Sequence, residues 1–338
     1  MTTVYFKALE KGFDVQTTFL RFNFFGHDVR IQWYGVLIAF GFTLAVLFGG
    51  RMAYKWKMNL DKMIDVLIGG TVLGVIGARL YFVLFHWDLY KENPMDVFKI
   101  WEGGLAIYGG LIGGLIGAAI VCKVRDLSFL KLLDLCGMSF LIGQGIGRWG
   151  NFTNQEAFGT NTNLPWGMWS QTIANDINSR AFELAAHGIT VDGGSITDKA
   201  YVHPTFLYES IWCLAAFAVL YWICSKHRKF DGQIMLCYGI LYGAERAVVE
   251  GLRLDSLYIG STNIRISQLL SAILVVVCGA LLTALLIKHK DDPVLPADLR
   301  HYFVTEEEEE VADTVEDAAM QPEDAAMLPD TPTEDTEA

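Results

Sequence analysis

Charged residues are scarce in this chain. Of its 338 residues only 19% are Asp, Glu, Lys or Arg, whereas 52% are apolar, and the mean hydropathy is +0.32. This balance excludes an ordinary soluble domain and is typical of a polytopic membrane protein. Seven apolar stretches are long enough, at about 20 residues each, to cross a bilayer: residues 33–50, 63–85, 103–122, 129–148, 205–224, 233–250 and 266–287. We therefore expect an all-α integral membrane protein with seven transmembrane helices.

Cysteine is also sparse, and its pattern excludes two further classes. The six cysteines lie in apolar segments, without a CxxC motif or a cluster with histidine: Cys122, Cys136, Cys213, Cys224, Cys237 and Cys278. Neither a disulfide framework nor a zinc site is indicated, and small buried side chains are the simpler interpretation. Residues 1–30 likewise lack the basic start, apolar stretch and cleavage site of a signal peptide.

The net charge of −12 is concentrated at the C-terminal end. Residues 291–338 hold 17 acidic residues and one arginine, a local charge of −16, so the other 290 residues carry +4. A segment of this composition cannot bury a core. We expect a disordered tail, and a solvated extension without chemistry is the simplest interpretation of it.

Basic residues mark every second loop between the apolar stretches. They follow the first, third, fifth and seventh stretches: Arg51, Lys55, Lys57 and Lys62; Lys123, Arg125 and Lys131; Lys226, Arg228 and Lys229; Lys288 and Lys290. Because Lys and Arg in short loops stay on the cytoplasmic side, this pattern predicts an outside N-terminus and a cytoplasmic C-terminus. Residues 1–30 and the long loop 151–204 would then be extracytoplasmic, 31–290 would form the membrane domain, and the tail 291–338 would be cytoplasmic.

The most informative polar residues follow directly on the fourth apolar stretch. Arg148, Asn151, Asn154 and Glu156 come after the apolar run 129–146, in a stretch that also contains several glycines. An arginine at the centre of a membrane helix costs about 2.5 to 3.5 kcal/mol, and less near the helix ends. Glycine lets a ligand approach the backbone closely. The stretch therefore predicts a polar site set into the membrane.

A second polar cluster lies in the sixth stretch. Spacings of four, four and three residues put Tyr242, Arg246, Glu250 and Arg253 on one helical face. An Arg246–Glu250 ion pair that only satisfies itself is the simpler interpretation, but Arg253 would then be a spare cation that indicates an anionic ligand. Arginines from different helices suit a phosphate, because the guanidinium fork binds its oxygens through two hydrogen bonds. The residues thus predict a phospholipid head-group site at the outer leaflet.

Three further positions allow two interpretations each. His203 stands at the entry to the fifth stretch, where a structural role is as well supported as a functional one. Tyr108 lies in a glycine-rich opening of the third stretch, which is more typical of close helix packing, although its hydroxyl could reach a ligand. Tyr34 begins the first stretch, where an interfacial aromatic belt is the default explanation.

These residues stand in blocks that resemble the bacterial prolipoprotein diacylglyceryl transferases. The blocks follow in family order across residues 30–287: Trp33-Tyr34-Gly35, Gly77-Ala78-Arg79-Leu80-Tyr81, Trp101-Glu102-Gly103-Gly104-Leu105, Gly147-Arg148-Trp149-Gly150-Asn151-Phe152-Thr153-Asn154-Gln155-Glu156, His203-Pro204-Thr205 with Leu207-Tyr208-Glu209, and Tyr242-Gly243 with Arg246, Glu250 and Arg253. The resemblance implies transfer of a diacylglyceryl group from phosphatidylglycerol to the lipobox cysteine thiol of a prolipoprotein, with release of glycerol phosphate.

The resemblance also implies roles for single residues. The phosphatidylglycerol site would comprise Arg148, Asn151, Asn154, Glu156 and Tyr34; the catalytic group Arg246, Glu250 and Tyr108; and the supporting group His203, Tyr242, Arg253 and Gly159. The partners would be phosphatidylglycerol, other membrane lipids and the prolipoprotein signal peptide with its lipobox cysteine, for which the outer segment 160–202 would be the dock. A multi-pass location in the bacterial cytoplasmic membrane follows, and no metal, cofactor or nucleic acid is expected.

Tyr108 departs from the family pattern, because many members have histidine there. A free tyrosine has a pKa near 10 against about 6.5 for histidine, and is the poorer base near neutrality. Tyr108 could only position groups while Glu250 or His203 takes the thiol proton, or the arginines could lower the pKa of the substrate thiol. Two other classes compete with an enzyme: a transporter or scramblase, which predicts internal repeats and polar groups at mid-membrane, and a lipid-binding scaffold, which would tolerate loss of Glu250.

Overall fold

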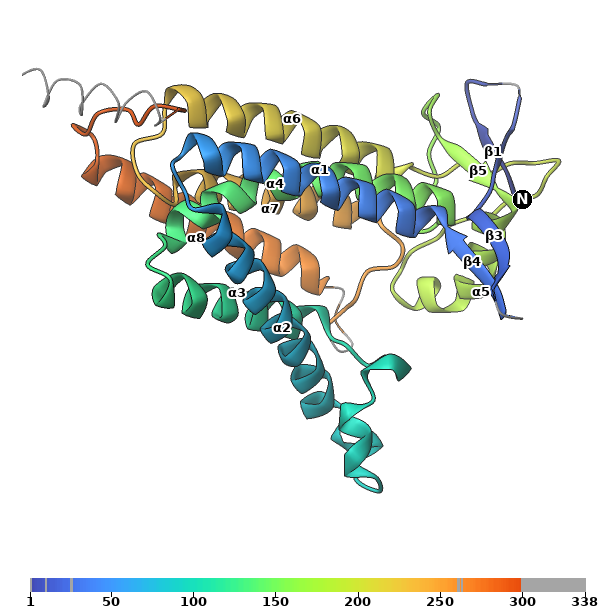
Figure 1. Ribbon diagram of the computed structural model, residues 1–338. Helices are drawn as coiled ribbons and strands as arrows, with labels where there is room; N and C mark the ends of the chain where they lie inside the picture. The colour runs from blue at the N-terminus through green and yellow to red at the C-terminus, as the bar shows by residue number, and fades with distance from the viewer. Residues whose placement is uncertain (1, 10, 25–26, 260–261, 263, 299–338) are drawn as a thin grey trace, which may run out of the picture. The chain divides into compact units, whose positions relative to one another are not determined.

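The computed structural model describes residues 2–9, 11–24, 27–259, 262 and 264–298 (Figure 1). The chain divides into two units, residues 1–297 and 298–338, and all described helices and strands belong to the first. Of the disordered acidic tail expected over 291–338, residues 299–338 lie outside the described residues.

A helix forms at each of the seven apolar stretches. These helices are α1 (Trp33–Lys55), α2 (Leu60–Phe85), α3 (Ile107–Val124), α4 (Phe129–Asn154), α6 (Thr205–Lys226), α7 (Gln233–Leu252) and α8 (Ile266–Lys288). Among the described residues, six of them are long and apolar enough to cross a membrane. The exception is α7, whose 20 residues include Glu245, Arg246 and Glu250. A multi-pass membrane protein is thereby confirmed, whereas the seventh crossing stays a prediction.

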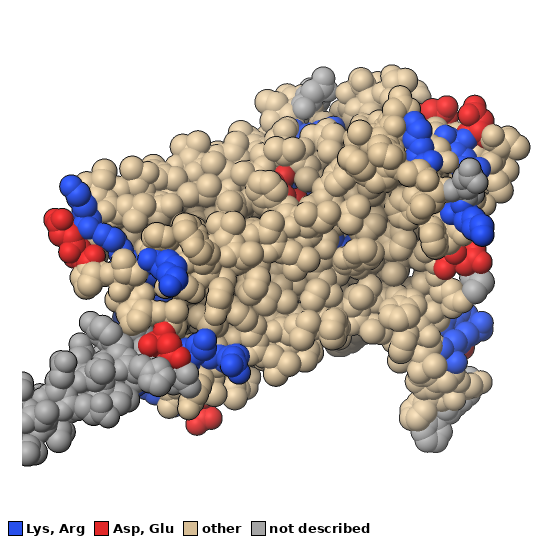
Figure 2. Space-filling view, turned by 90° about the horizontal axis from the view of Figure 1, so that it is seen from above, with Lys and Arg blue, Asp and Glu red and all other residues tan. Residues whose placement is uncertain are grey.

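On the face that Figure 2 shows, charged side chains are almost absent from the middle of the molecular surface. Figure 2 shows Lys, Arg, Asp and Glu gathered toward the two ends of the visible face, with a nearly uncharged belt between them and a little colour deep in a crevice. Such a belt is what the hydrocarbon layer of a bilayer requires of a protein surface.

Several helix ends differ from the expected bounds, and two of these differences shape the site. α3 begins at Ile107 rather than at 103, because Gly103 and Gly104 have φ angles of 92° and 76° that a right-handed helix excludes. α4 continues to Asn154, past the expected end at 148, and stops where Gln155 takes a left-handed φ of 56°. Arg148 therefore lies on the helix itself, with its side chain one turn from that of Asn151.

The expectation of an all-α fold is corrected to a mostly helical one. β1 (Thr2–Phe6) pairs antiparallel with β2 (Phe13–Val15) and with β5 (Met168–Ser170), giving the order β2-β1-β5, and β3 (Thr18–Phe24) forms a hairpin with β4 (His27–Gln32). The loop between α4 and α6 contains one further helix, α5 (Gln171–Ala186), and the loop between α2 and α3 contains the 3-10 turns η1 (Trp87–Leu89), η2 (Pro94–Phe98) and η3 (Ile100–Glu102).

The three-stranded sheet ties the N-terminal segment to the loop after α4. Val4 of β1 lies opposite Ser170 of β5, and a buried apolar cluster joins the sheet to its surroundings. Its members come from the sheet, from α5 and from the segments that flank α4, α6 and α7: Val4, Phe158, Met168, Ile173, Ile177, Leu184, Val202, Phe206 and Leu254. This small core holds the segment 155–204 against the end of α4 that carries Arg148.

α4 is the central helix and packs against α1, α6 and α7. Glycines allow close contact on each side: a Cβ on Gly41 of α1 would lie 3.2 Å from the Gly143 carbonyl, one on Gly145 3.3 Å from Cys213 Cβ of α6, and one on Gly137 3.3 Å from Tyr238 Cβ of α7. α7 also packs against α6 and α8, while α2 packs chiefly against α3. Small residues at such contacts let helix backbones approach in the absence of a hydrophobic driving force.

A buried polar cluster joins these helices at the end remote from Arg148. The Asp134 carboxylate accepts hydrogen bonds from the backbone N–H groups of Gly232 (2.8 Å) and Met235 (2.9 Å), so α4 caps the start of α7. Arg228 Nε lies 3.8 Å from the same carboxylate, and its guanidinium covers the Trp56 ring at 4.1 Å. The cluster thereby fixes α7 along α4.

The α2–α3 contact gives a first testable prediction. Gly77→Ala should lower the thermal midpoint in detergent micelles, because the added Cβ would lie 2.5 Å from the Gly109 carbonyl of α3; such overpacking costs about 1 to 3 kcal/mol. Gly50→Ala in α1 is the matched control, since nothing lies within 4 Å of its Cβ position and alanine favours the helix. Equal midpoints for the two variants would contradict this packing.

Candidate functional site

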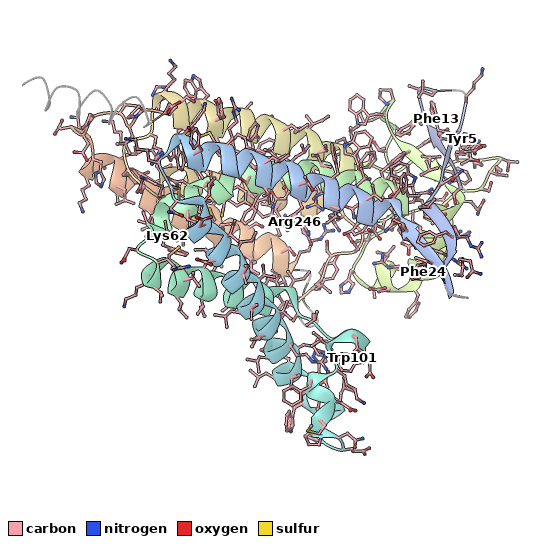
Figure 3. All side chains as sticks on the ribbon, in the orientation of Figure 1. Tyr5, Phe13, Phe24, Lys62, Trp101 and Arg246 are labelled. Atoms are coloured by element: carbon pink, nitrogen blue, oxygen red, sulfur yellow. The ribbon has the colours of Figure 1, made fainter. Side chains whose placement is uncertain are left out.

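Three arginines meet at one buried carboxylate, that of Glu209 in the second turn of α6. Its Oε1 lies 3.1 Å from Arg148 Nη2 of α4, 3.3 Å from Arg246 Nη1 of α7 and 3.7 Å from Arg253 Nη1 just after α7. The Glu209 side chain is 1% exposed, whereas those of Arg148 and Arg246 are 21% and 19% exposed (Arg246 is labelled in Figure 3). The predicted convergence of Arg148, Arg246 and Arg253 is therefore present, with a carboxylate at its centre.

Two further carboxylates balance the arginines. Arg246 Nη2 lies 2.6 Å from Glu250 Oε2, so the expected Arg246–Glu250 pair exists, but Arg246 bridges two acids instead of satisfying one. Arg253 is not the spare cation that its spacing indicated, because it donates to both oxygens of Asp255 at 2.8 and 2.6 Å. Burial alone would raise the pKa of Asp255, but the hydrogen bonds and charge of Arg253 hold it below its usual range. The site is thus a nearly neutral cluster rather than a bare cationic pocket.

Glu209 and Glu245 were not assigned a role from the sequence. Glu209 stood in a matching block without a function, although a carboxylate so early in an apolar helix is a recognisable signal. Glu245 is 4% exposed, and its Oε1 has no hydrogen-bond partner among the residues that the structure describes. In the part of the chain that the structure describes, no group of three or more His, Cys, Asp and Glu side chains could hold a metal ion.

A pocket of about 400 Å³ runs between α1 and α4 and reaches the arginine cluster. Its polar end comprises Tyr34, Arg148 and Asn151, and its walls are largely apolar: Ile38, Phe42, Ala45, Phe140, Gly143 and Gly147, with Ser139 and Gln144. From residue 139 to residue 151 the helix rises about 18 Å, at 1.5 Å per residue. A cation at one end and a long apolar wall behind it suit an amphiphile with an anionic head.

Asn151, Asn154 and Glu156 come together at the turn that ends α4. Glu156 Oε1 accepts hydrogen bonds from Asn151 Nδ2 at 2.9 Å and from Asn154 Nδ2 at 3.4 Å. Gln155 and Ala157 on either side have φ angles of 56° and 57°, which non-glycine residues adopt at a cost of about 1 to 3 kcal/mol. The structure offsets this strain, because Ser170 donates to the Gln155 side chain and Thr205 donates to the Ala157 carbonyl.

The supporting residues lie around this turn and around the pocket. His203 Nδ1 is 3.0 Å from the Tyr208 hydroxyl, and burial lowers the pKa of His203, which keeps its ring neutral near pH 7. A Cβ on Gly159 would lie 2.9 Å from that of His203, so only glycine fits there. The Tyr242 ring stacks on the Tyr238 ring, with 5.6 Å between the ring centroids. The Tyr238 hydroxyl in turn accepts a hydrogen bond from the pocket residue Gln144.

Tyr108 is the one predicted catalytic residue that the structure does not join to the cluster. It lies in the first turn of α3, its residue is 43% exposed, and it forms no hydrogen bond or ring contact with any residue in the described ranges. Nearby, Arg79 of α2 does make such contacts: it donates to the carbonyls of Val97, Gly103 and Gly104 at 2.7 to 3.0 Å and so holds the loop before α3.

Fold and site together define a class: a multi-pass membrane protein with an arginine–carboxylate cluster at the polar end of an amphiphile-sized pocket. The sequence model of the prolipoprotein diacylglyceryl transferases matches residues 22–284. The chain is 42% identical over 261 residues to the phosphatidylglycerol–prolipoprotein diacylglyceryl transferase of Finegoldia magna, covering 77% of this chain and 92% of that protein. It is 40% identical over 263 residues to the enzyme of the same name from Staphylococcus aureus strain Newman, covering 77% and 87%. The chain therefore belongs to the prolipoprotein diacylglyceryl transferase family and is a transferase of lipoprotein biosynthesis.

Removing the Glu209 charge should destabilise the protein. Glu209→Gln leaves the surrounding arginines without the acid that they share, and breaking a buried ion pair costs about 3 to 5 kcal/mol. We expect a clear fall of the thermal midpoint in micelles. Glu183→Gln is the control, because that side chain is 65% exposed in its pair with Arg180 and such pairs contribute about 0 to 1 kcal/mol. An unchanged midpoint for Glu209→Gln would show that this carboxylate does not hold the cluster.

Proposed function

We propose that this chain transfers the diacylglyceryl group of phosphatidylglycerol to the lipobox cysteine thiol of a prolipoprotein. The observation that carries the proposal is the pocket between α1 and α4, which ends at Arg148. The names of the relatives, which state a phosphatidylglycerol donor and a prolipoprotein acceptor, support it. The reaction is the first step of lipoprotein maturation and takes place in the bacterial cytoplasmic membrane.

The orientation of the helices is part of the proposal: all seven cross the membrane, with the N-terminus outside and the C-terminus in the cytoplasm. α7 has 20 residues, about 30 Å of helix, and packs among α4, α6 and α8 with Glu245 and Glu250 buried. Its charges therefore face protein and not lipid. Three of the basic loops meet at one end, since the Arg228 guanidinium of the loop after α6 covers Trp56 after α1, and the Arg228 carbonyl accepts a hydrogen bond from Leu295 N after α8.

The phospholipid would bind with its phosphate at the arginines and an acyl chain along the apolar wall of the pocket. Arg148 is placed for the phosphate, because it lines the pocket and is partly exposed. Asn151, Asn154 and Glu156 would hold the hydroxyls of the head-group glycerol, since amides and a carboxylate supply both donors and acceptors. Tyr34, whose ring lies against Gly150, would close the other side.

The chemistry is a displacement at the glycerol carbon that carries the phosphate. The sulfur–carbon bond forms as the carbon–oxygen bond to phosphate breaks; the phosphate oxygen keeps the bonding electrons and leaves with the head-group glycerol, and the thiol proton passes to a base. The protein has to align the reacting atoms and stabilise charge on the leaving phosphate. Arg148 and Arg246 serve the second purpose, and Glu250 holds Arg246 from the other side.

Three groups could take the thiol proton. Glu250 is already held by Arg246 at 2.6 Å and is buried, so an incoming thiol would have to displace an ion pair to reach it. His203 is kept neutral by burial and therefore has a lone pair to accept a proton. Tyr108 is exposed enough to meet the incoming acceptor, but a phenol is a poor base near pH 7. We assign Arg246 and Glu250 to charge stabilisation and Tyr108 to contact with the acceptor. His203 is then the remaining candidate for the base that takes the thiol proton.

Replacing either arginine tests the phosphate assignment. Arg148→Ala and Arg246→Ala should each lower transfer from phosphatidylglycerol to a lipobox peptide by about 100-fold or more, because a charge-stabilising donor is lost. Lysine should restore only part of the rate, since it lacks the two-pronged fork. Arg125→Ala, with a half-exposed side chain paired with Asp65, is the control and should keep the full rate. Full transfer by both alanine variants would refute the assignment.

Tyr108 is tested by paired substitutions in the same assay. If the residue only contacts the acceptor, Tyr108→Phe should keep kcat within about threefold and raise KM for the peptide, because the ring stays while the hydroxyl is lost. Tyr108→His should then give no gain at pH 7. A phenylalanine variant with lost kcat, rescued by histidine, would instead show that the side chain at this position exchanges the proton.

A further inference from the structure

The β3–β4 hairpin has one apolar and one charged face. Its register pairs Leu20 with Ile31 and Phe22 with Val29, alternating with Arg21 opposite Arg30 and Asn23 opposite Asp28. Because successive strand residues point to opposite sides, the four apolar residues share one face and the four polar residues share the other. Neither the resemblance of the chain to its family nor the proposed reaction assigns this hairpin a role.

The apolar face is uncovered, whereas the charged face satisfies itself. Leu20, Phe22 and Ile31 are 48%, 39% and 37% exposed. On the other face, Asp28 accepts hydrogen bonds from Arg21 Nε and Arg30 Nε, each at 2.8 Å, and these hydrogen bonds lower the pKa of Asp28 to about 2. The face is therefore a fixed ion triad with one surplus positive charge. A two-stranded ribbon with such a bare apolar side is marginal by itself in water.

The hairpin is fastened to the first membrane helix. β4 ends at Gln32 and α1 begins at Trp33, so no residue lies between them. Trp33 N donates to the Thr17 carbonyl at 2.8 Å, and the Phe19 ring meets the Trp33 ring edge-on at 4.7 Å. α1 itself exposes large apolar side chains along its length, among them Phe40 at 54% and Leu47 at 63%. The hairpin thus begins where the lipid-facing surface of α1 ends; Figure 3 labels Phe24 near its tip.

We propose that the β3–β4 hairpin is a membrane-docking element, with its apolar face in the head-group layer and its arginine face on the aqueous side of that layer, where the long arginine side chains reach the phosphates of anionic lipids at the hairpin's edges. Three observations favour lipid over another protein: the direct continuity with α1, the presence at the junction of Trp33, a residue type enriched at membrane interfaces, and the surplus positive charge on the opposite side from the apolar row. The docked hairpin holds the start of α1, and with it Tyr34 at the pocket mouth, at the level of the head groups. The contact with lipid does not depend on the proposed reaction.

The test uses neighbouring residues on opposite faces of one strand. Phe22→Cys and Asn23→Cys are labelled with an environment-sensitive fluorophore in full-length protein and placed in vesicles of phosphatidylethanolamine and phosphatidylglycerol. The unsubstituted protein, labelled identically, gives the background of its six native cysteines, of which five are buried and Cys136 is half-buried. The protein inserts into the vesicles in both orientations, and the mixture is the same for the two labelled variants. The ratio of quenching at position 22 to quenching at position 23 is therefore independent of that mixture. Val29→Cys provides a second reporter on the apolar face from the other strand.

Quenching by spin-labelled lipid and by aqueous iodide then decides the question. We expect the probes at 22 and 29 to be quenched by the lipid at least threefold more than the probe at 23, with the reverse order for iodide. Equal iodide quenching at 22 and 23 would overturn the proposal. Protection at 22 that disappears when the protein is diluted toward one copy per vesicle would overturn it too, in favour of contact with a second copy. Protection that survives dilution supports lipid as the occupant.

Discussion

The buried carboxylate of Glu209 is the group on which the arrangement of the site depends. A charge taken out of water is tolerated only when opposite charges and hydrogen bonds surround it, and in this protein the surroundings come from three places in the chain. Arg148 is on α4, Arg246 is on α7 and Arg253 is just beyond α7, and all of them approach the same oxygen. Glu209 therefore aligns α4, α6 and α7, and it also sets where the guanidinium groups point.

α4 carries this alignment along its whole length. At one end Asp134 caps α7 through two backbone N–H groups, and at the other end Arg148 shares an acid with Arg246. Between Asp134 and Arg148 the helix rises about 21 Å, so α7 is fixed against α4 at two well-separated points. Such double anchoring resists sliding of one helix along the other, and a site assembled from two helices needs that rigidity.

The parts of the structure that follow from membrane physics could be predicted from the sequence. Lipid requires long apolar runs, so a helix forms at every expected stretch. Lipid also penalises charge, so Arg148, Arg246 and Glu250 stood out as candidate site residues, and the structure brings them into one cluster of ion pairs. Contacts between distant segments were not predictable. β1 is only five residues long and pairs with β5, a strand more than 160 residues away. Arg253 looked unpaired because Asp255, two residues on, lies outside any helical spacing. Glu209 belonged to one of the matching sequence blocks, but its contacts with the arginines of α4 and α7 could not be predicted without the fold.

Arg148 and Arg246 are equally exposed, yet they are bound differently, and this difference suits the proposed reaction. Arg148 contacts Glu209 through Nη2, while its Nε and Nη1 form no hydrogen bond or ion pair with the residues that the structure describes, so it can bind a phosphate without leaving the cluster. Arg246 has both Nη groups committed, to Glu209 and to Glu250. A phosphate diester with a single charge competes poorly with two carboxylates for Arg246. As the carbon–oxygen bond breaks, charge grows on the phosphate and the competition shifts toward it. In the proposed reaction Arg246 would then interact more strongly with the transition state than with the bound lipid, and only such an interaction accelerates the chemical step.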